Sequence, residues 1–182
     1  MAHQTPSQIE QMVLQAAYQK LFDYMSQRVP LKDEELELMK NYYHLRKVQK
    51  KDFFLKEGSK HFQQGFVVQG TLRVFYTDAK GNEHVLYFAF PDWWVGDLSA
   101  FHFDDVATLN VQALEDSYML EISREDLEFL FDKVPSLERL FRIMAQRTLA
   151  VLQKRFLMTV SAHAEERYQE LLNRHPGIEQ LV

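Results

Sequence analysis

The hydrophobic pattern of the chain changes twice, from helical spacing to strand spacing near Lys51 and back to helical spacing near Ser123. Before the first change, apolar residues recur every three or four positions, which is typical of an amphipathic helix. These residues are Ile9, Met12, Val13, Ala16, Ala17, Leu21 and Met25. We expect Ser7 to cap this helix and Pro30 to end it. A second short helix should follow, with its apolar side made by Leu31, Leu36, Leu38 and Met39.

Short apolar runs alternate with turn residues throughout the segment from Lys51 to Ile122. Leu72, Val74 and Tyr76 alternate with Arg73 and Phe75, which is the period-two signature of a strand. Further strands are expected at 66–68, 85–90, 109–113 and 118–122, with turns at 78–82 and 91–92. Many short strands separated by turns favour a closed jelly roll or a sandwich.

After the strands, Ser123 reads as a helix cap, because Glu125 and Asp126 follow where the first turn of a helix prefers acids. Pro135 then precedes a long helical run from Ser136 to about Thr159. A further helix, capped by Ser161, should end near residues 175–177, where His-Pro-Gly interrupts the pattern.

Two apolar stripes run along the long helix. One holds Leu137, Leu140, Met144, Val151 and Met158, and the other holds Phe141, Ala145, Leu149, Leu152, Phe156 and Thr159. From Ala145 onward the second stripe steps by four and three residues in turn, which is coiled-coil spacing. A helix that is apolar on two sides needs two partners, so we expect the second stripe to form a homodimer interface. The alternative is that both stripes pack within one protomer.

The composition and the net charge argue against several classes of function. Hydrophobic residues make up 46% of the 182 residues, enough for a packed core. The net charge of −5 argues against nucleic-acid binding by the bulk of the chain. The absence of cysteine excludes disulfides, thiolate catalysis and iron–sulfur clusters ligated by cysteine. We see neither a signal peptide nor an apolar run long enough to cross a bilayer, so we expect a cytoplasmic protein without membrane contact.

The most informative short segment is Trp93-Trp94-Val95-Gly96-Asp97-Leu98. A glycine followed by a carboxylate at the end of a strand can open backbone N–H groups toward a ligand. The carboxylate can accept a hydrogen bond from a ligand hydroxyl. The same dipeptide is also an ordinary turn, which is the alternative interpretation.

Wider context favours the ligand-site interpretation. The chain resembles the Crp/Fnr family of transcription regulators over roughly residues 30 to 160. The segments that carry the resemblance occur in the family's order and spacing; they are Gly70-Thr71-Leu72-Arg73, Gly81-Asn82-Glu83, Val95-Gly96-Asp97-Leu98, Ala113-Leu114-Glu115-Asp116, Glu121-Ile122-Ser123 and Pro135. The resemblance implies an α+β fold: a double-stranded β-helix (jelly-roll) barrel of the cyclic-nucleotide-binding type, with N-terminal helices and a long C-terminal dimerisation helix.

The resemblance also implies a division into four parts. Residues 1–45 would form the N-terminal helices, and residues 46–134 the barrel with its following short helix. Residues 135–160 would form the dimerisation helix, and residues 161–182 a helix that leads into a DNA-binding module.

The chain departs from the family members that bind cyclic AMP. Their phosphate-binding segment begins Gly-Glu-Leu and ends near Arg-Ser, whereas this chain has Asp97 for the glutamate and Ala107-Thr108 for the Arg-Ser pair. No Lys or Arg lies between Leu98 and Tyr118, and Asp104 and Asp105 add negative charge. A neutral residue cannot replace the arginine that pairs with the cyclic phosphate.

The long helix departs as well. It has Leu152-Gln153 where the cyclic AMP receptor has purine-contacting residues, and Thr148 in place of an arginine. We therefore expect no useful binding of cyclic AMP. The candidate ligand-binding residues are Gly96, Asp97, Leu98, Ala107, Thr108, Thr148, Leu152 and Gln153. Another effector could sit beside Asp97, or Phe and Trp side chains could fill the pocket.

We recognise no catalytic or metal-binding motif in the sequence. A cupin enzyme would share the barrel but would need a His-x-His pair, and Glu83-His84 is the nearest approach. His84 and His102 could be proposed as haem ligands, although isolated histidines are more often structural. We expect no enzyme activity and no metal cofactor.

The C-terminal segment from Ser161 to Arg174 resembles the helix that leads into the family's DNA-binding wing, and the sequence reaches only Val182. A helix-turn-helix does not fit in the remaining residues. We therefore interpret the chain as the effector-sensing and dimerisation portion of a Crp/Fnr-type regulator. It would contact DNA only through a C-terminal module not present here, with RNA polymerase as a further partner. The alternative is a stand-alone dimeric ligand-binding or interaction module without DNA binding.

Overall fold

The computed structural model describes residues 8–60, 63–103, 105–161, 169, 172–173 and 178. The chain forms two units, Met1–Ser136 and Leu137–Val182, and each is described by itself. The first unit holds the strands together with helices α1 (Gln8–Ser26), α2 (Asp33–Met39), α3 (Leu98–Phe103) and α4 (Arg124–Lys133). The second unit holds nearly all of the long helix α5 (Pro135–Ser161).

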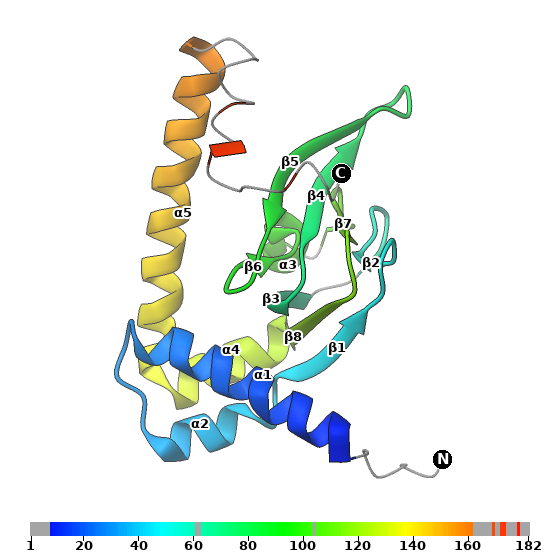
Figure 1. Cartoon of the computed structure of the whole chain (residues 1–182). Helices are drawn as coiled ribbons and strands as arrows, with labels where there is room; N and C mark the ends of the chain where they lie inside the picture. Colours follow the sequence, from blue (N-terminus) through cyan, green and yellow to red (C-terminus); the bar gives the residue numbers. More distant parts are fainter. Residues whose placement is uncertain are drawn as a thin grey trace. The chain divides into compact units, whose positions relative to one another are not determined.

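Within the described ranges, eight strands form two antiparallel sheets of four strands each (Figure 1). They are β1 (His44–Val48), β2 (Phe53–Leu55), β3 (Gln63–Gln69), β4 (Leu72–Thr77), β5 (Glu83–Ala89), β6 (Trp94–Val95), β7 (Asn110–Ala113) and β8 (Ser117–Ser123). The first sheet has the order β1-β8-β3-β6 and the second the order β2-β7-β4-β5. Apart from the consecutive strands β4 and β5, neighbours in each sheet come from distant parts of the chain, which gives the predicted α+β jelly-roll barrel.

The barrel interior is filled by apolar side chains from both sheets. The buried cluster comprises Val48, Phe54, Leu55, Val67, Leu72, Val74, Ala89, Val95, Ala100, Ala107, Val111, Ala113 and Met119. Packing is tight at Gly65, where a Cβ atom would clash with the end of the Met119 side chain and lie 2.9 Å from Cζ of Phe54. Close packing of this kind keeps the barrel core free of large voids.

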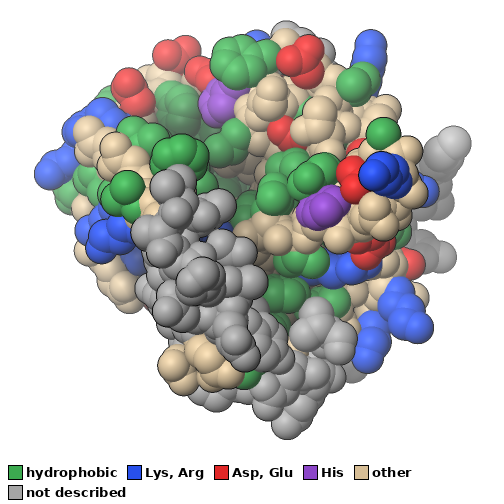
Figure 2. All heavy atoms as spheres, turned by 90° about the horizontal axis from the view of Figure 1, so that it is seen from above, with side chains coloured by type: hydrophobic (Ala, Val, Ile, Leu, Met, Phe, Trp, Pro, Cys, Tyr) green, Lys and Arg blue, Asp and Glu red, His purple; other side chains and the backbone are tan. Residues whose placement is uncertain are grey.

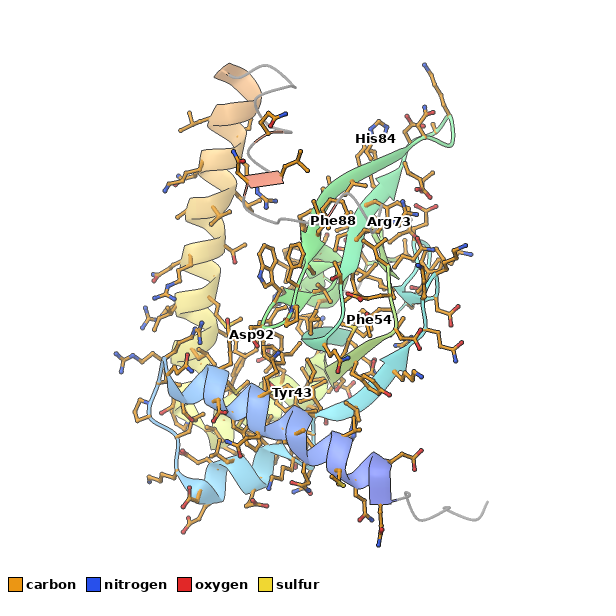
Figure 3. All side chains as sticks on the ribbon, viewed as in Figure 1. Tyr43, Phe54, Arg73, His84, Phe88 and Asp92 are labelled. Atoms are coloured by element: carbon orange, nitrogen blue, oxygen red, sulfur yellow. The ribbon has the colours of Figure 1, made fainter. Side chains whose placement is uncertain are left out.

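Helix α1 covers the outer face of the β1-β8-β3-β6 sheet. Its buried side chains are Ala17, Tyr18, Leu21, Phe22 and Met25. The Tyr18 hydroxyl lies 2.8 Å from the carbonyl oxygen of Tyr43, and Lys20 Nζ donates to the carbonyl oxygen of Val68 at 2.8 Å. The ring of Tyr24 packs against Phe66 of β3 with 5.2 Å between ring centroids. Figure 3 shows Tyr43 in this layer, near α1.

Several predicted boundaries agree with the structure. Ser123 caps α4, because its side-chain oxygen accepts from the backbone N–H of Asp126, and Pro135 begins the long helix. Helix α1 ends at Ser26 rather than at Pro30. The strands begin earlier than Lys51, since β1 starts at His44, and α3 is an additional helix. The helix predicted to start at Ser161 falls largely outside the described residues.

Helix α5 is apolar on several sides. Leu137 and Leu140 at its start are buried, whereas Leu149, Leu152 and Phe156 are 60%, 54% and 69% exposed. None of the helices in the described ranges combines the length and the hydropathy that crossing a membrane requires.

Candidate functional site

The candidate site begins where β6 leaves its sheet. Trp94 and Val95 pair with Phe66 and Gly65 of β3, and the chain then turns at Gly96. Gly96 has φ +157°, and a Cβ atom there would lie 3.2 Å from the carbonyl oxygen of Gln63. Glycine therefore suits this turn, which aims Asp97 into the loop that follows.

The carboxylate of Asp97 is enclosed by its own loop. Oδ1 accepts the backbone N–H groups of Ser99 and Ala100 at 3.0 and 3.2 Å, so Asp97 caps the N-terminus of α3. Oδ2 accepts the N–H and the hydroxyl of Thr108 at 2.8 and 2.9 Å, and the N–H of Leu109 at 3.2 Å. These bonds join both ends of the segment 97–109, which we call the α3 loop.

Burial and hydrogen bonding act on the acidity of Asp97 in opposite directions. The residue is only 4% exposed, and this burial by itself raises the carboxyl pKa. The N–H groups of Thr108, Ala100 and Leu109 and the Thr108 hydroxyl favour the ionised form, and the net result is a lowered pKa. Asp97 is therefore an anion at neutral pH, neutralised by donors of its own chain.

Ala107 occupies the position where the resemblance places an arginine. Its side chain is buried in the barrel core at 2% exposure. Its backbone pairs with the turn after β2, because Ala107 N–H donates to Ser59 O at 2.9 Å and Gly58 N–H donates to Ala107 O at 2.7 Å. The position thus serves the packing of the barrel and places no charge in the loop.

A cation does reach the α3 loop, but from α4. Arg124 Nη1 donates to the carbonyl oxygens of Phe101 and His102 at 3.4 and 3.3 Å. These are among the last carbonyl groups of α3, where a positive charge is favourable. Sequence reasoning missed this contact, because Arg124 directly follows the helix cap Ser123 and lies far along the chain from the loop it holds.

Apolar side chains of the α3 loop face solvent. Leu98, Phe103 and Val106 are all exposed. More generally, hydrophobic side chains reach the surface among charged side chains of both signs on the face seen in Figure 2. The loop therefore combines a buried, satisfied carboxylate with an outer surface suited to apolar contacts.

The two tryptophans do not belong to the buried barrel cluster. Trp94 packs against Phe66 and Tyr43, with centroid distances of 5.5 and 6.2 Å, in the layer between the sheet and α1. Trp93 lies near Tyr87 and Phe90. Within that cluster Phe54 is the aromatic side chain, as Figure 3 illustrates.

The remaining predicted site residues lie on α5, in the second unit. Thr148, Leu152 and Gln153 are exposed. The structure thus brings the candidates into two groups: Gly96, Asp97, Leu98, Ala107 and Thr108 in the α3 loop, and Thr148, Leu152 and Gln153 on the long helix. Of the predicted dimer interface, Ala145, Leu149, Leu152 and Phe156 are exposed and Phe141 is half-buried, while the side chain of Thr159 is outside the described set.

The histidines proposed as haem ligands have separate surroundings. His84 Nε2 lies 3.0 Å from Asp78 Oδ2, and its ring stacks on Tyr76 at the end of the β4–β5 hairpin. His102 lies edge-on to Phe101 on α3. Across the described ranges, no three His, Cys, Asp or Glu residues are grouped so that they could hold a metal ion.

Comparison with known proteins supports the architecture. Residues 45–134 match the family model described as "Cyclic nucleotide-binding domain". The Thermus thermophilus catabolite activator protein is similar with a TM-score of 0.63 and 20% identity, over 75% of this chain and 63% of that chain. The chain thus spans less than two thirds of that protein. No curated protein matches the sequence.

Two further solved structures show the same likeness. One is the c-di-GMP responsive global regulator CLP of Xanthomonas campestris, with a TM-score of 0.66 and 16% identity over 80% of this chain and 74% of that chain. The other is the sensor domain of the transcriptional regulator DNR of Pseudomonas aeruginosa, with a TM-score of 0.59 and 15% identity over 84% and 96% of the two chains. The barrel of this protein, with its flanking helices, therefore has the fold of the cyclic nucleotide-binding domain.

Proposed function

We propose that this chain is the effector-sensing and dimerisation portion of a Crp/Fnr-type transcription regulator, and that cyclic AMP is not its effector. The fold, and its likeness to a solved sensor domain of a transcriptional regulator, support the assignment to an effector-sensing portion. The regulator would act as a homodimer and reach DNA and RNA polymerase through a further module.

The geometry of Asp97 supports the proposal that cyclic AMP is not the effector. Its two oxygens already accept five hydrogen bonds within the α3 loop. A ribose hydroxyl would have to displace the Thr108 hydroxyl or a backbone N–H group, so it would gain little. Ala107 adds no counter-charge for a phosphate, and a buried anion without a partner is strongly unfavourable.

The outer surface of the α3 loop indicates a different kind of effector. Leu98, Phe103 and Val106 are exposed and apolar, and the negative charge of Asp105, directly before Val106, disfavours anions. An uncharged or weakly anionic, partly aromatic molecule would match this surface better than a cyclic nucleotide.

Titration calorimetry with cyclic AMP tests the proposal. We expect no saturable heat at millimolar nucleotide. Micromolar binding by the unmodified chain would overturn the proposal.

The homodimer is proposed on the exposed face of α5. Ala145, Leu149, Leu152 and Phe156 form a seam of coiled-coil spacing, and all four are exposed in the single chain. Burying such a seam against its own copy removes about 25 cal/mol of unfavourable hydration per Å² of apolar surface. A two-fold pair of helices is the simplest arrangement that covers it.

A further inference from the structure

Positive and negative charges are distributed unevenly between helix α5 and the rest of the chain. Helix α5 contains five Lys and Arg residues against one Glu, which gives a formal charge of +4. The other residues contain sixteen Lys and Arg against twenty-five Asp and Glu, which gives −9. The total of −5 therefore conceals a cationic helix on an otherwise acidic protein.

Three of these cations share one side of the helix, are exposed and have no ion pair with any described residue. They are Arg139, Arg147 and Lys154, and we call them the α5 basic row. At 3.6 residues per turn, Arg139, Arg147 and Lys154 fall within an arc of about 80°, and the row extends about 22 Å along the axis. A helix surface normally places acids three or four residues from its cations, and here no acid follows Glu138 within α5.

The row is separate from the proposed dimer seam. Arg147 and Lys154 lie about 180° around the helix from the centre of the seam, at the outermost positions of a coiled coil. The residues that flank the seam include Gln146, Thr148 and Gln153, which are neutral. Dimerisation therefore neither uses nor buries the row, which remains open to an anionic partner.

We propose that the α5 basic row binds the phosphate backbone of duplex DNA. Two of its three members are arginines, whose planar guanidinium groups match phosphate oxygens. The row is straight and lacks an aromatic side chain, whereas a protein interface usually centres on buried aromatic anchors. A duplex presents a straight line of closely spaced negative charges and needs no such anchor. The contact is independent of any effector in the barrel and of any additional DNA-binding module.

The acidic remainder of the chain sets the conditions for binding. Its charge of −9 repels DNA at long range, so the contact is confined to the helix and is weak. Three phosphate contacts predict a slope of about −2.7 for the logarithm of the association constant against the logarithm of salt concentration. Affinity should therefore fall roughly 40-fold between 50 and 200 mM salt.

Fluorescence anisotropy of a labelled 20-base-pair duplex, titrated with the whole chain at several salt concentrations, tests this inference. Arg147→Gln with Lys154→Gln should reduce the steepness of the salt slope by about 2 and weaken binding at least tenfold at 50 mM salt. Lys50→Gln with Lys80→Gln is the control, because it removes the same charge from exposed positions of the barrel. Circular dichroism verifies that both variants remain folded, as expected for exposed side chains.

Three results would overturn the inference. The first is no binding of the duplex at 100 µM protein and 50 mM salt. The second is an equal loss of affinity in both double variants, which would reflect total charge rather than the α5 basic row. The third is equally tight binding of poly-L-glutamate of the same charge, which would assign the row to an acidic protein instead. Failure of the cyclic nucleotide experiment would leave all three measurements unaffected.

Discussion

Asp97 offers the sharpest test of the proposed site, because one side chain joins the two ends of the α3 loop. Replacing it by alanine removes the acceptor of five hydrogen bonds. The N-terminus of α3 loses its cap, and the N–H groups of Thr108 and Leu109 lose their partner. Ala100 and Ala107 of the loop itself belong to the barrel core, so we expect the disturbance to reach the core.

The expected loss in free energy of unfolding is the sum of the contributions of the two carboxylate oxygens of Asp97. Loss of a helix cap costs about 1 kcal/mol. Each donor left without the Oδ2 partner costs about 1 kcal/mol, the lower end of the range, because these groups are only partly buried and water can replace some bonds. The sum for Asp97→Ala is about 4 kcal/mol. A domain of this size is stable by about 5–15 kcal/mol, so the variant should approach instability.

Two companion substitutions separate hydrogen bonding from charge and from general surface effects. Asp97→Asn retains one carbonyl acceptor and should lose about half as much free energy of unfolding, about 2 kcal/mol. Asp116→Asn is the control, because Asp116 is exposed, accepts one backbone bond from Lys50 and pairs with Lys47. Its unfolding midpoint should hardly change.

Urea unfolding followed by tryptophan fluorescence provides the measurement, because Trp93 and Trp94 lie within four residues of Asp97 in the sequence. The order of midpoints should be wild type and Asp116→Asn highest, then Asp97→Asn, then Asp97→Ala. If Asp97→Ala shifts the midpoint no more than Asp116→Asn, Asp97 does not hold the loop. It would then remain available to a ligand, contrary to our reasoning.

Three further predictions follow from the same structure. Since the pKa of folded Asp97 is lowered, its stabilisation is present above the unfolded pKa and is lost as pH falls through the folded value, so the loss of stability in acid should depend less steeply on pH in Asp97→Asn. Leu149→Glu with Leu152→Glu should give monomers by light scattering, and an unchanged dimer would place the interface elsewhere. Gly65→Ala should lower stability by about 1–3 kcal/mol through its clash with Met119, and an unchanged thermal midpoint would contradict the tight packing there.

Periodicity predicted much of the fold. Alternation placed β4, β7 and β8 close to their observed bounds, and local chemistry placed the start of α4 at Ser123 and of α5 at Pro135. The strand β1 was missed, because its consecutive charged residues Arg46 and Lys47 interrupt the alternation. The helix α3 was missed because it has only six residues, although an aspartate directly before Leu98 is a recognisable cap signal.

The site was less accessible to sequence reasoning than the fold. The spacing singled out Asp97, Ala107 and Thr108, and the structure places all three at the α3 loop. A ligand hydroxyl was expected on the Asp97 carboxylate, and the structure shows the hydroxyl of Thr108 there. Aspartate is one methylene shorter than glutamate, and its reach depends on loop closure between residues 97 and 108. Contacts of this kind, like that of Arg124, depend on three-dimensional closure and have no local signature.

The packing of α1 has a practical consequence for anyone who wishes to study a minimal domain. The family match begins at residue 45, and that border would seem a natural place to cut. A fragment starting there would lose Tyr18 and Tyr24 and would expose Phe66 to water. We expect such a fragment to precipitate during expression. The smallest soluble unit should start at or before Gln8, so the first helix belongs to the barrel rather than being an optional extension.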